Sequence, residues 1–302
     1  MKKLLLSFAA MFMAMQAAAQ KAELVYDLRV GETCCQTINT VVESEAAAQG
    51  MAITVNMEII VGISYKVIAD NGDSYEMEAE YTRMVVDTRN PYASTRIDSD
   101  MPDNDFVSKA FAAMTGNPFR MGMSKRGRVL YVGDTDGIVE KVMQEAGELS
   151  GSEKDQLEDL IRESFGGEAL EGNFRLVHDM FPEGVIFPGH KWGNTVKLNM
   201  GFPMEIAAEY EYVGIEDNDY ILTALAVADT GPEGIDVVLD GMPGKYIVGG
   251  TYVYDIRLDR ETCWTSQATI DMSMDVLGLI DMGYGETEME IKMEAKVYIT
   301  DK

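Results

Sequence analysis

The residues able to do chemistry in this sequence are few and scattered. His178 and His190 are its only histidines, and histidine is the side chain that ordinarily changes charge near neutral pH. His178 stands beside Asp179 in a stretch with helical periodicity, and His190 lies in a turn at residues 189–193. No nucleophile elbow, phosphate-binding glycine loop or His-Glu-x-x-His motif occurs anywhere in the chain. We therefore predict no catalytic residues and a protein that is not an enzyme.

Acidic and sulfur-containing side chains could in principle hold metal ions. The densest acidic cluster, residues 98–105, departs from the calcium-loop pattern, and its second half is explained as a helix start. Met-x-Met pairs begin at Met121 and Met272, but no His or Cys joins either pair to complete a Cu(I) site. We predict no metal site and no cofactor. The methionines either pack in a core or line a cavity that adapts to irregular ligands.

Three cysteines leave one thiol unpaired in any arrangement. Cys34 and Cys35 are adjacent, so on a strand they point to opposite faces and only one of them can meet Cys263. The sequence leaves open whether that bridge forms or all three are small buried apolar residues.

Residues 1–20 resemble a secretory signal peptide. Lys2 and Lys3 precede an apolar run, and Ala17-Ala18-Ala19 supplies a cleavage site of small residues. No later stretch approaches the ~18 apolar residues of a membrane helix. We expect an exported protein that is soluble after cleavage, periplasmic or associated with the outer envelope. The net charge of -26 also makes nucleic acid an improbable partner, because such a surface repels phosphates.

Two strand-rich regions flank a helical middle. Alternating apolar and polar residues predict strands at 24–29, 33–43, 53–69, 75–87, 93–98, 195–199, 204–215, 220–228, 250–258, 263–276 and 286–300. Four helices are expected within residues 103–181, and a short hairpin around Lys125-Arg126-Gly127 lies between the first two.

A weak repeat links the two strand-rich regions. Met57-Glu58-Ile59 matches Met204-Glu205-Ile206, and Asp70-Asn71 matches Asp217-Asn218 at the same offset. Each copy then turns and begins a new strand. The sequence leaves open whether this is a duplication or a likeness shared by any two amphipathic hairpins.

Several phrases resemble a family of exported proteins of unknown function that is common in Bacteroidota. The phrases are Leu28-Arg29-Val30-Gly31-Glu32-Thr33, the hairpin 65–86, Lys125-Arg126-Gly127-Arg128-Val129 and Gly189-His190-Lys191-Trp192. The resemblance spans most of residues 22–300 and carries no activity with it. It implies a long antiparallel sheet curved around helices, similar to the half-barrel of periplasmic lipoprotein carriers and lipid-binding lipoproteins.

The order strands, helices, strands predicts an α+β fold. We expect residues 21–302 to form one domain, in which the halves 21–132 and 189–302 build a large, curved, half-barrel-like antiparallel sheet. The helices of residues 103–181 would pack on its concave face and cover the apolar side of the strands.

The favoured function is non-enzymatic binding of a hydrophobic, lipid-like ligand between the sheet and its helices. The alternative is an envelope module for protein–protein interaction or structure, without a small-molecule ligand. The residues expected to line the ligand site are Met272, Met274, Met289, Ile291, Met293, Phe106, Phe111 and Met114. The identity of a ligand, a protein partner and the oligomeric state are not specified by the sequence.

Overall fold

The computed structural model describes residues 20–103, 106–145, 151–199, 203–239, 242–281 and 286–302. The predicted signal peptide, residues 1–20, lies outside this part except for Gln20. The strands of the described part are β1 (Ala22–Glu23), β2 (Thr33–Ala48), β3 (Met51–Asp70), β4 (Ser74–Arg89), β5 (Ser94–Asp98), β6 (Phe119–Ser124), β7 (Val129–Gly133), β8 (Val185–Ile186), β9 (Lys191–Asn199), β10 (Pro203–Glu216), β11 (Asp219–Asp229), β12 (Ile235–Leu239), β13 (Met242–Asp259), β14 (Thr265–Asp281) and β15 (Glu286–Thr300). The helices are α2 (Phe106–Met114), α3 (Asp136–Glu145), α4 (Gly151–Phe165) and α5 (Gly167–His178).

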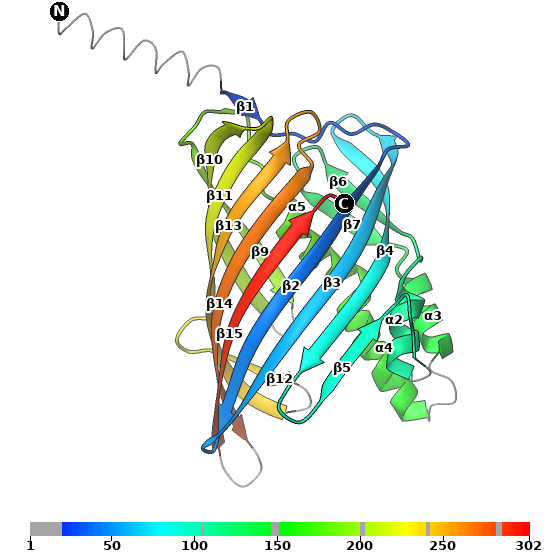
Figure 1. Cartoon of the computed structure of the whole chain (residues 1–302), viewed down its shortest axis with the longest axis vertical. Helices are drawn as coiled ribbons and strands as arrows, with labels where there is room; N and C mark the ends of the chain where they lie inside the picture. Colours follow the sequence, from blue (N-terminus) through cyan, green and yellow to red (C-terminus); the bar gives the residue numbers. More distant parts are fainter. Residues whose placement is uncertain (1–19, 104–105, 146–150, 200–202, 240–241, 282–285) are drawn as a thin grey trace, which may run out of the picture.

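Thirteen of these strands form a single antiparallel sheet (Figure 1). Its main path runs β7-β6-β4-β3-β2-β15-β14-β13-β11-β10-β9, with β5 paired to β4 and β12 paired to β13. The last strand, β15, pairs with β2 from Thr300 opposite Thr37 to Met289 opposite Ala48. This pairing joins the two strand-rich regions of the sequence into one continuous sheet. Strands β1 and β8 form a separate two-stranded sheet.

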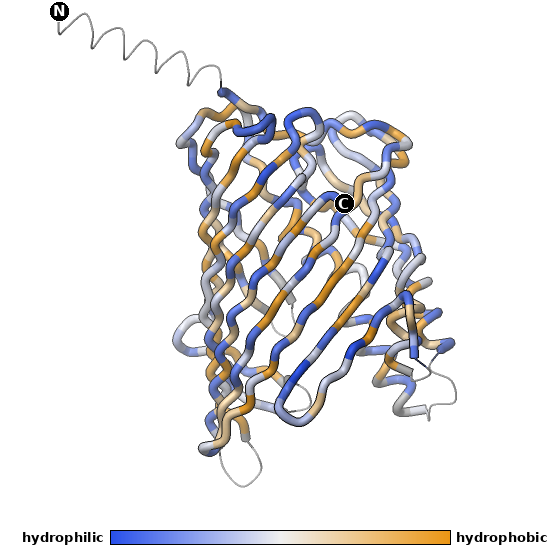
Figure 2. Tube along the Cα trace, in the orientation of Figure 1, coloured by the Kyte–Doolittle hydropathy of each residue, from blue (hydrophilic) through white to orange (hydrophobic). Residues whose placement is uncertain are grey.

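Alternation along each long strand gives the sheet one apolar face. On β4, the side chains of Tyr75, Met77 and Ala79 are buried, whereas Glu76 and Glu78 between them face the other side and are partly exposed. Successive side chains of a strand point to opposite faces, so this pattern turns one side of β4 toward the core. Figure 2 shows hydrophobic and hydrophilic residues alternating along the neighbouring long strands as well.

The sheet curves so strongly that its two ends share one core. Buried Tyr81 and Phe119, from β4 and β6, belong to the same hydrophobic cluster as Tyr210 and Leu222, from β10 and β11. Helix α5 contacts both terminal strands of the sheet path, β7 and β9. Distant strands of the sheet therefore contribute to one core, and α5 bridges its two free edges.

The α+β class predicted from the sequence is wrong, because the described protein is mostly β, with one wide sheet and four short helices. The segment 103–181 does not form a helical layer on the concave face. Helices α2, α3 and α4 contact one another beside β4 and β5, at one side of the sheet (Figure 1). The physical reason is the width of the sheet: a twisted sheet of this many strands curls and buries its own apolar face.

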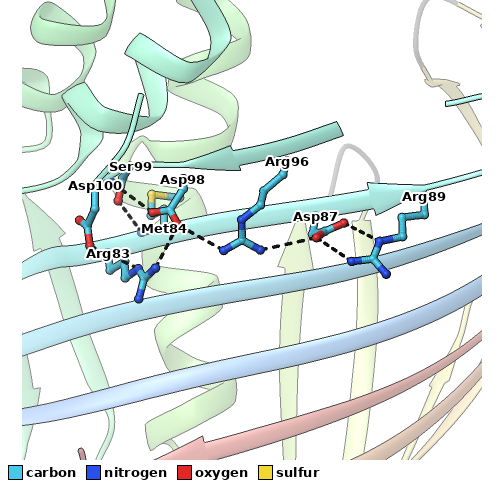
Figure 3. Close-up of polar contacts among 8 residues, drawn as sticks. All are labelled: Arg83, Met84, Asp87, Arg89, Arg96, Asp98, Ser99 and Asp100. Atoms are coloured by element: carbon cyan, nitrogen blue, oxygen red, sulfur yellow. Dashed lines mark hydrogen bonds and ion pairs between the residues drawn. The ribbon is translucent and has the colours of Figure 1, made fainter. Parts of the chain in front are cut away.

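A chain of ion pairs connects β5 to β4 (Figure 3). The carboxylate of Asp98 accepts from Arg83 at 3.0 Å and from Arg96 at 3.3 Å, and Arg83 also lies 3.4 Å from Asp100. Burial raises the pKa of Asp98, but the hydrogen bonds from Arg83, Arg96 and the Asp100 backbone N–H, together with the charge of Arg83, outweigh burial and lower it. Two carboxylates of the acidic cluster 98–105 are thus engaged by arginine.

Both copies of the weak repeat are hairpins within the sheet, formed by β3 with β4 and by β10 with β11. They differ at the turn: Gly72 has a φ of 91° in the first, whereas Asp217 and Asn218 have φ values of 48° and 75° in the second. The second turn thus connects its strands through two residues in the left-handed backbone conformation, which is typical of tight two-residue hairpins.

Candidate functional site

An apolar cavity of about 350 Å³ lies between the inner face of the sheet and α5. The described residues that line it come from β2, β10, β13, β14, β15 and the region of α5, and none of them carries a charge. They are Ile38, Thr40, Asn173, Leu176, Val177, Met180, Ile206, Tyr210, Tyr252, Tyr254, Ile256, Thr265, Ala268, Ile270, Met272, Val297 and Ile299.

Strand register builds the floor of this cavity. Ala268 of β14 pairs with Ile256 of β13 on one side and with Ile299 of β15 on the other. Two residues further along β14, Ile270 likewise pairs with one residue of β13 and one of β15, and Met272 does the same two residues later. Because side chains two apart share a face, the alternating sequence places these apolar side chains in parallel rows facing inward.

Aromatic rings form one wall of the cavity. The ring of Trp192 stacks on Tyr210 with centroids 5.7 Å apart, and Tyr210 lies 6.3 Å from Tyr254. The Trp192 indole N–H donates to the carbonyl of Met180 at 2.8 Å, which fixes this stack to the chain after α5. Burial raises the pKa of Tyr210 to about 12, so its phenol is neutral at physiological pH.

Helix α5 closes the cavity opposite the floor. At its start, a methyl group on Gly167 would lie 2.6 Å from the Val132 carbonyl oxygen, so the helix approaches β7 at backbone contact distance. Beyond its end, the side-chain amide of Asn194, on β9, donates to the carbonyl of Asp179. The helix is therefore tied to both free edges of the sheet and presents Leu176 and Val177 to the cavity.

One end of the cavity adjoins an aromatic cluster, formed by Tyr26, Tyr65, Phe174, His178 and Trp264, of which the last three are chain neighbours of lining residues. We call this the closed end. Ring centroids of Tyr65 lie 5.2 Å from Trp264 and 5.4 Å from His178. The Nδ1 atom of His178 hydrogen-bonds the Tyr26 hydroxyl at 3.1 Å. Burial lowers the pKa of His178 to about 4, which keeps the imidazole neutral. His178 therefore acts as a packed, uncharged member of this cluster.

The predicted ligand-lining residues fall into two groups. Met272 lines the cavity, and Met274, Met289, Ile291 and Met293 continue the same inner face of β14 and β15 beyond it. We call these four residues the distal inner face. Their side chains are partly exposed, and they stay a prediction as ligand contacts.

The predicted residues of α2 lie apart from the cavity, in a helix that contacts α3, β4 and β5. Met114 is buried in the core and Phe111 packs against it. The side chain of Phe106 lies outside the described residues.

The sequence alone did not identify the aromatic wall of the cavity, which includes Tyr210 and Tyr254, or the contribution of α5. A signal for the wall was present, since Tyr252-Val253-Tyr254 places two rings on one face of a strand. No local pattern marks Leu176 and Val177 as cavity residues, because their position opposite the floor depends on the curvature of the sheet.

The remaining candidates for chemistry lie elsewhere. His190 is exposed, and its ring stacks on Trp192 with centroids 6.0 Å apart. Cys34, Cys35 and Cys263 are free thiols, and burial raises the pKa of Cys263 to about 11, which disfavours the nucleophilic thiolate. In the described part of the chain, no helix is long and apolar enough to cross a membrane.

Fold and cavity together define a β-sheet protein in which one wide antiparallel sheet encloses an apolar site. Residues 72–265 match the model of a family of unknown function, DUF6263, and the chain belongs to this family. Comparison with curated proteins finds no match.

Likeness to solved structures is remote. A structure described as lipid–protein interactions in lipovitellin has a TM-score of 0.48 at 9% identity, covering 91% of this chain and 25% of the lipovitellin chain. This protein therefore spans a quarter of that chain's length. OpdQ from Pseudomonas aeruginosa has a TM-score of 0.24 at 7% identity, and the match covers 89% of this chain and 99% of the OpdQ chain. An outer membrane channel from Pseudomonas putida F1 has a TM-score of 0.18 at 7% identity, and the match covers 91% of this chain and 97% of the channel chain.

Proposed function

We propose that this protein binds a hydrophobic, lipid-like molecule in the cavity between the sheet and α5, without transforming it chemically. The observation that carries the proposal is the lining itself: a partly open cavity of about 350 Å³ is lined by uncharged, mostly aliphatic and aromatic side chains. That volume falls within the roughly 300–1,000 Å³ of ligand pockets.

Affinity for such a ligand would come from removing apolar surface from water, at roughly 25 cal/mol per Å². Met272, Met180 and Leu176 add flexible side chains to the lining, which suits ligands of irregular shape. The outer face differs sharply, since it carries ion pairs such as Lys296 with Asp271 at 3.2 Å. A charged outer surface around an apolar interior allows a hydrophobic molecule to be held in an aqueous compartment.

The compartment forms part of the proposal. The sequence of residues 1–20 favours export, and an exported carrier or reservoir would meet lipid-like molecules in the periplasm or at the outer envelope.

The test begins with the protein purified under non-denaturing conditions. Native mass spectrometry is expected to show a bound small molecule that organic solvent extracts, and the emptied protein should bind the fluorescent probe N-phenyl-1-naphthylamine. Ala268→Trp, on the cavity floor, should abolish probe binding while the protein stays folded, because the indole occupies the cavity. Thr269→Trp is the matched control, since Thr269 faces the outer side with its pairing partner Tyr298, which is 43% exposed.

Probe binding that is equal in Ala268→Trp and Thr269→Trp would contradict the proposal, as would a folded, extracted protein that binds no hydrophobic probe. The second result would favour the alternative, a module for protein–protein interaction without a small-molecule ligand.

A further inference from the structure

Buried polar groups without a partner gather at the closed end of the cavity. Among the described residues, the hydroxyl oxygen of Thr265, the Nε2 of Gln36 and the Nε2 of His178 have no hydrogen-bond partner. Thr265 is 2% exposed and lines the cavity, and it directly follows Trp264 of the aromatic cluster. Buried hydroxyls in proteins are almost always hydrogen-bonded, so an unpaired one beside a cavity points to a bound partner.

Gln36 and His178 lie on the same side as Thr265, around Tyr65. The Tyr65 hydroxyl donates to Oε1 of Gln36 at 3.3 Å, and its ring packs edge-on to His178 and Trp264. The Thr265 hydroxyl thus lines the cavity without a partner, and the other two unpaired groups lie in or beside the adjoining aromatic cluster.

From Thr265 onward, the inner face offers a long apolar path. Ala268, Ile270, Met272, Met274 and Val276 follow one another on the inward side of β14. At about 3.4 Å per residue, the stretch from Ala268 to Val276 is roughly 27 Å long. Their inward neighbours on β15 are Ile299, Val297, Ala295, Met293 and Ile291, and none of these is charged.

We propose that the ligand is an uncharged long-chain molecule with a hydroxyl or carbonyl group at one end. That polar end hydrogen-bonds Thr265 beside the aromatic cluster, and the chain lies along β14 and β15 toward Met293 and Ile291. This inference rests on the proposed function, because it specifies the ligand of the same cavity.

Charge separates this ligand class from fatty acids and phospholipids. No described lining residue carries a positive charge that could neutralise a carboxylate or phosphate, and transferring an uncompensated ion into an apolar site is strongly unfavourable. A plain hydrocarbon would fit the path but leave Thr265 unsatisfied.

The experiment compares three twelve-carbon competitors against bound N-phenyl-1-naphthylamine: 1-dodecanol, dodecane and ionised dodecanoate. One hydrogen bond between uncharged groups predicts that dodecanol displaces the probe at about fivefold lower concentration than dodecane. Dodecanoate should be the weakest. Thr265→Val, which keeps the shape and removes the hydroxyl, should erase the difference between dodecanol and dodecane and leave dodecane unchanged. Thr269→Val, on the outer face, should keep the wild-type order.

The direction of the chain is tested by bromine quenching of tryptophan fluorescence. In a Trp192→Phe protein, Trp264 is the one remaining tryptophan, because the sequence contains two. Bromine next to the hydroxyl, in 2-bromododecan-1-ol, should quench Trp264 more than bromine at the far end, in 12-bromododecan-1-ol. This measurement needs no substitution at Thr265.

Each outcome has a defined meaning. Equal binding of dodecanol and dodecane, tightest binding of dodecanoate, or stronger quenching by the far bromine would overturn the inference, while binding itself upholds the proposed function. Failure of the extracted protein to bind the probe and all three competitors would overturn the proposed function instead.

Discussion

The two ends of the sheet's inner face have the same alternating sequence pattern but very different packing. On β3, Tyr65 and Val67 are 0% and 1% exposed, whereas Ile53 and Met51, near the other end of the same strand, are 41% and 70% exposed. At the first end the aromatic cluster and α5 cover the sheet. Toward the second end lies the distal inner face, which is only partly covered. The apolar pattern therefore indicates which side of a strand faces inward, and the elements packed opposite determine how deeply that side is buried.

This difference has a consequence for function. The closed end is packed as a protein core and sets a fixed boundary for the cavity, whereas the distal inner face leaves apolar side chains accessible. Under the proposed function, a hydrophobic ligand would enter from the accessible end and stop at the aromatic cluster.

The largest expected effect contrasts truncations at the two ends. Tyr65→Ala removes a ring that packs against Phe174, His178 and Trp264, so it should lower the free energy of unfolding by about 3–5 kcal/mol. Met293→Ala, on the distal inner face, should lower it by about 1 kcal/mol, because that side chain is already partly exposed. Urea denaturation measures both. Similar losses at the two sites would show that the distal inner face is as well packed as the aromatic cluster.

The next effect is a pH dependence specific to the closed end. The unfolded chain protonates His178 below about pH 6.5, while burial holds its folded pKa near 4. Stability is therefore fully present above the unfolded pKa and is lost as the pH falls from about 6.5 to about 4, by a total of about 3 kcal/mol. His178→Asn should remove this contribution, measured as the difference from wild type in urea denaturation across that range.

His190→Asn is the control for this measurement, because His190 is exposed. Its pH profile should parallel that of the wild type. A His178→Asn profile that also parallels the wild type would contradict a buried, neutral His178.

The smallest effect compares two glycines of similar conformation at opposite ends. Gly50, in the turn between β2 and β3, has a φ of 77° and nothing near the position of an added methyl group. Gly127, in the turn between β6 and β7, has a φ of 82°, and an added methyl group would collide with the backbone carbonyl of His178. Gly50→Ala should cost about 1 kcal/mol from backbone strain alone, and Gly127→Ala about 2 kcal/mol more from the collision. Equal losses in thermal or urea unfolding would show that the turn at Gly127 is free to move away from α5.

Much of the local structure was predictable from the sequence. The alternation in residues 286–300 coincides with β15, and the four helices expected within residues 103–181 are present as α2, α3, α4 and α5. These predictions succeed because side-chain periodicity and helix-ending glycines are properties of neighbouring residues. The inward position of Met272 follows from the same alternation.

The tertiary structure alone decided the class of the fold and the shape of the site. No local pattern shows that β2 pairs with β15, that the sheet curls until α5 spans its free edges, or that Tyr210 and Tyr254 form a wall opposite Leu176. Sequence determined which face of each strand is apolar, because that depends on a period of two residues. Pairing between distant strands and the twist summed over the sheet determined which apolar faces touch one another and which leave space between them.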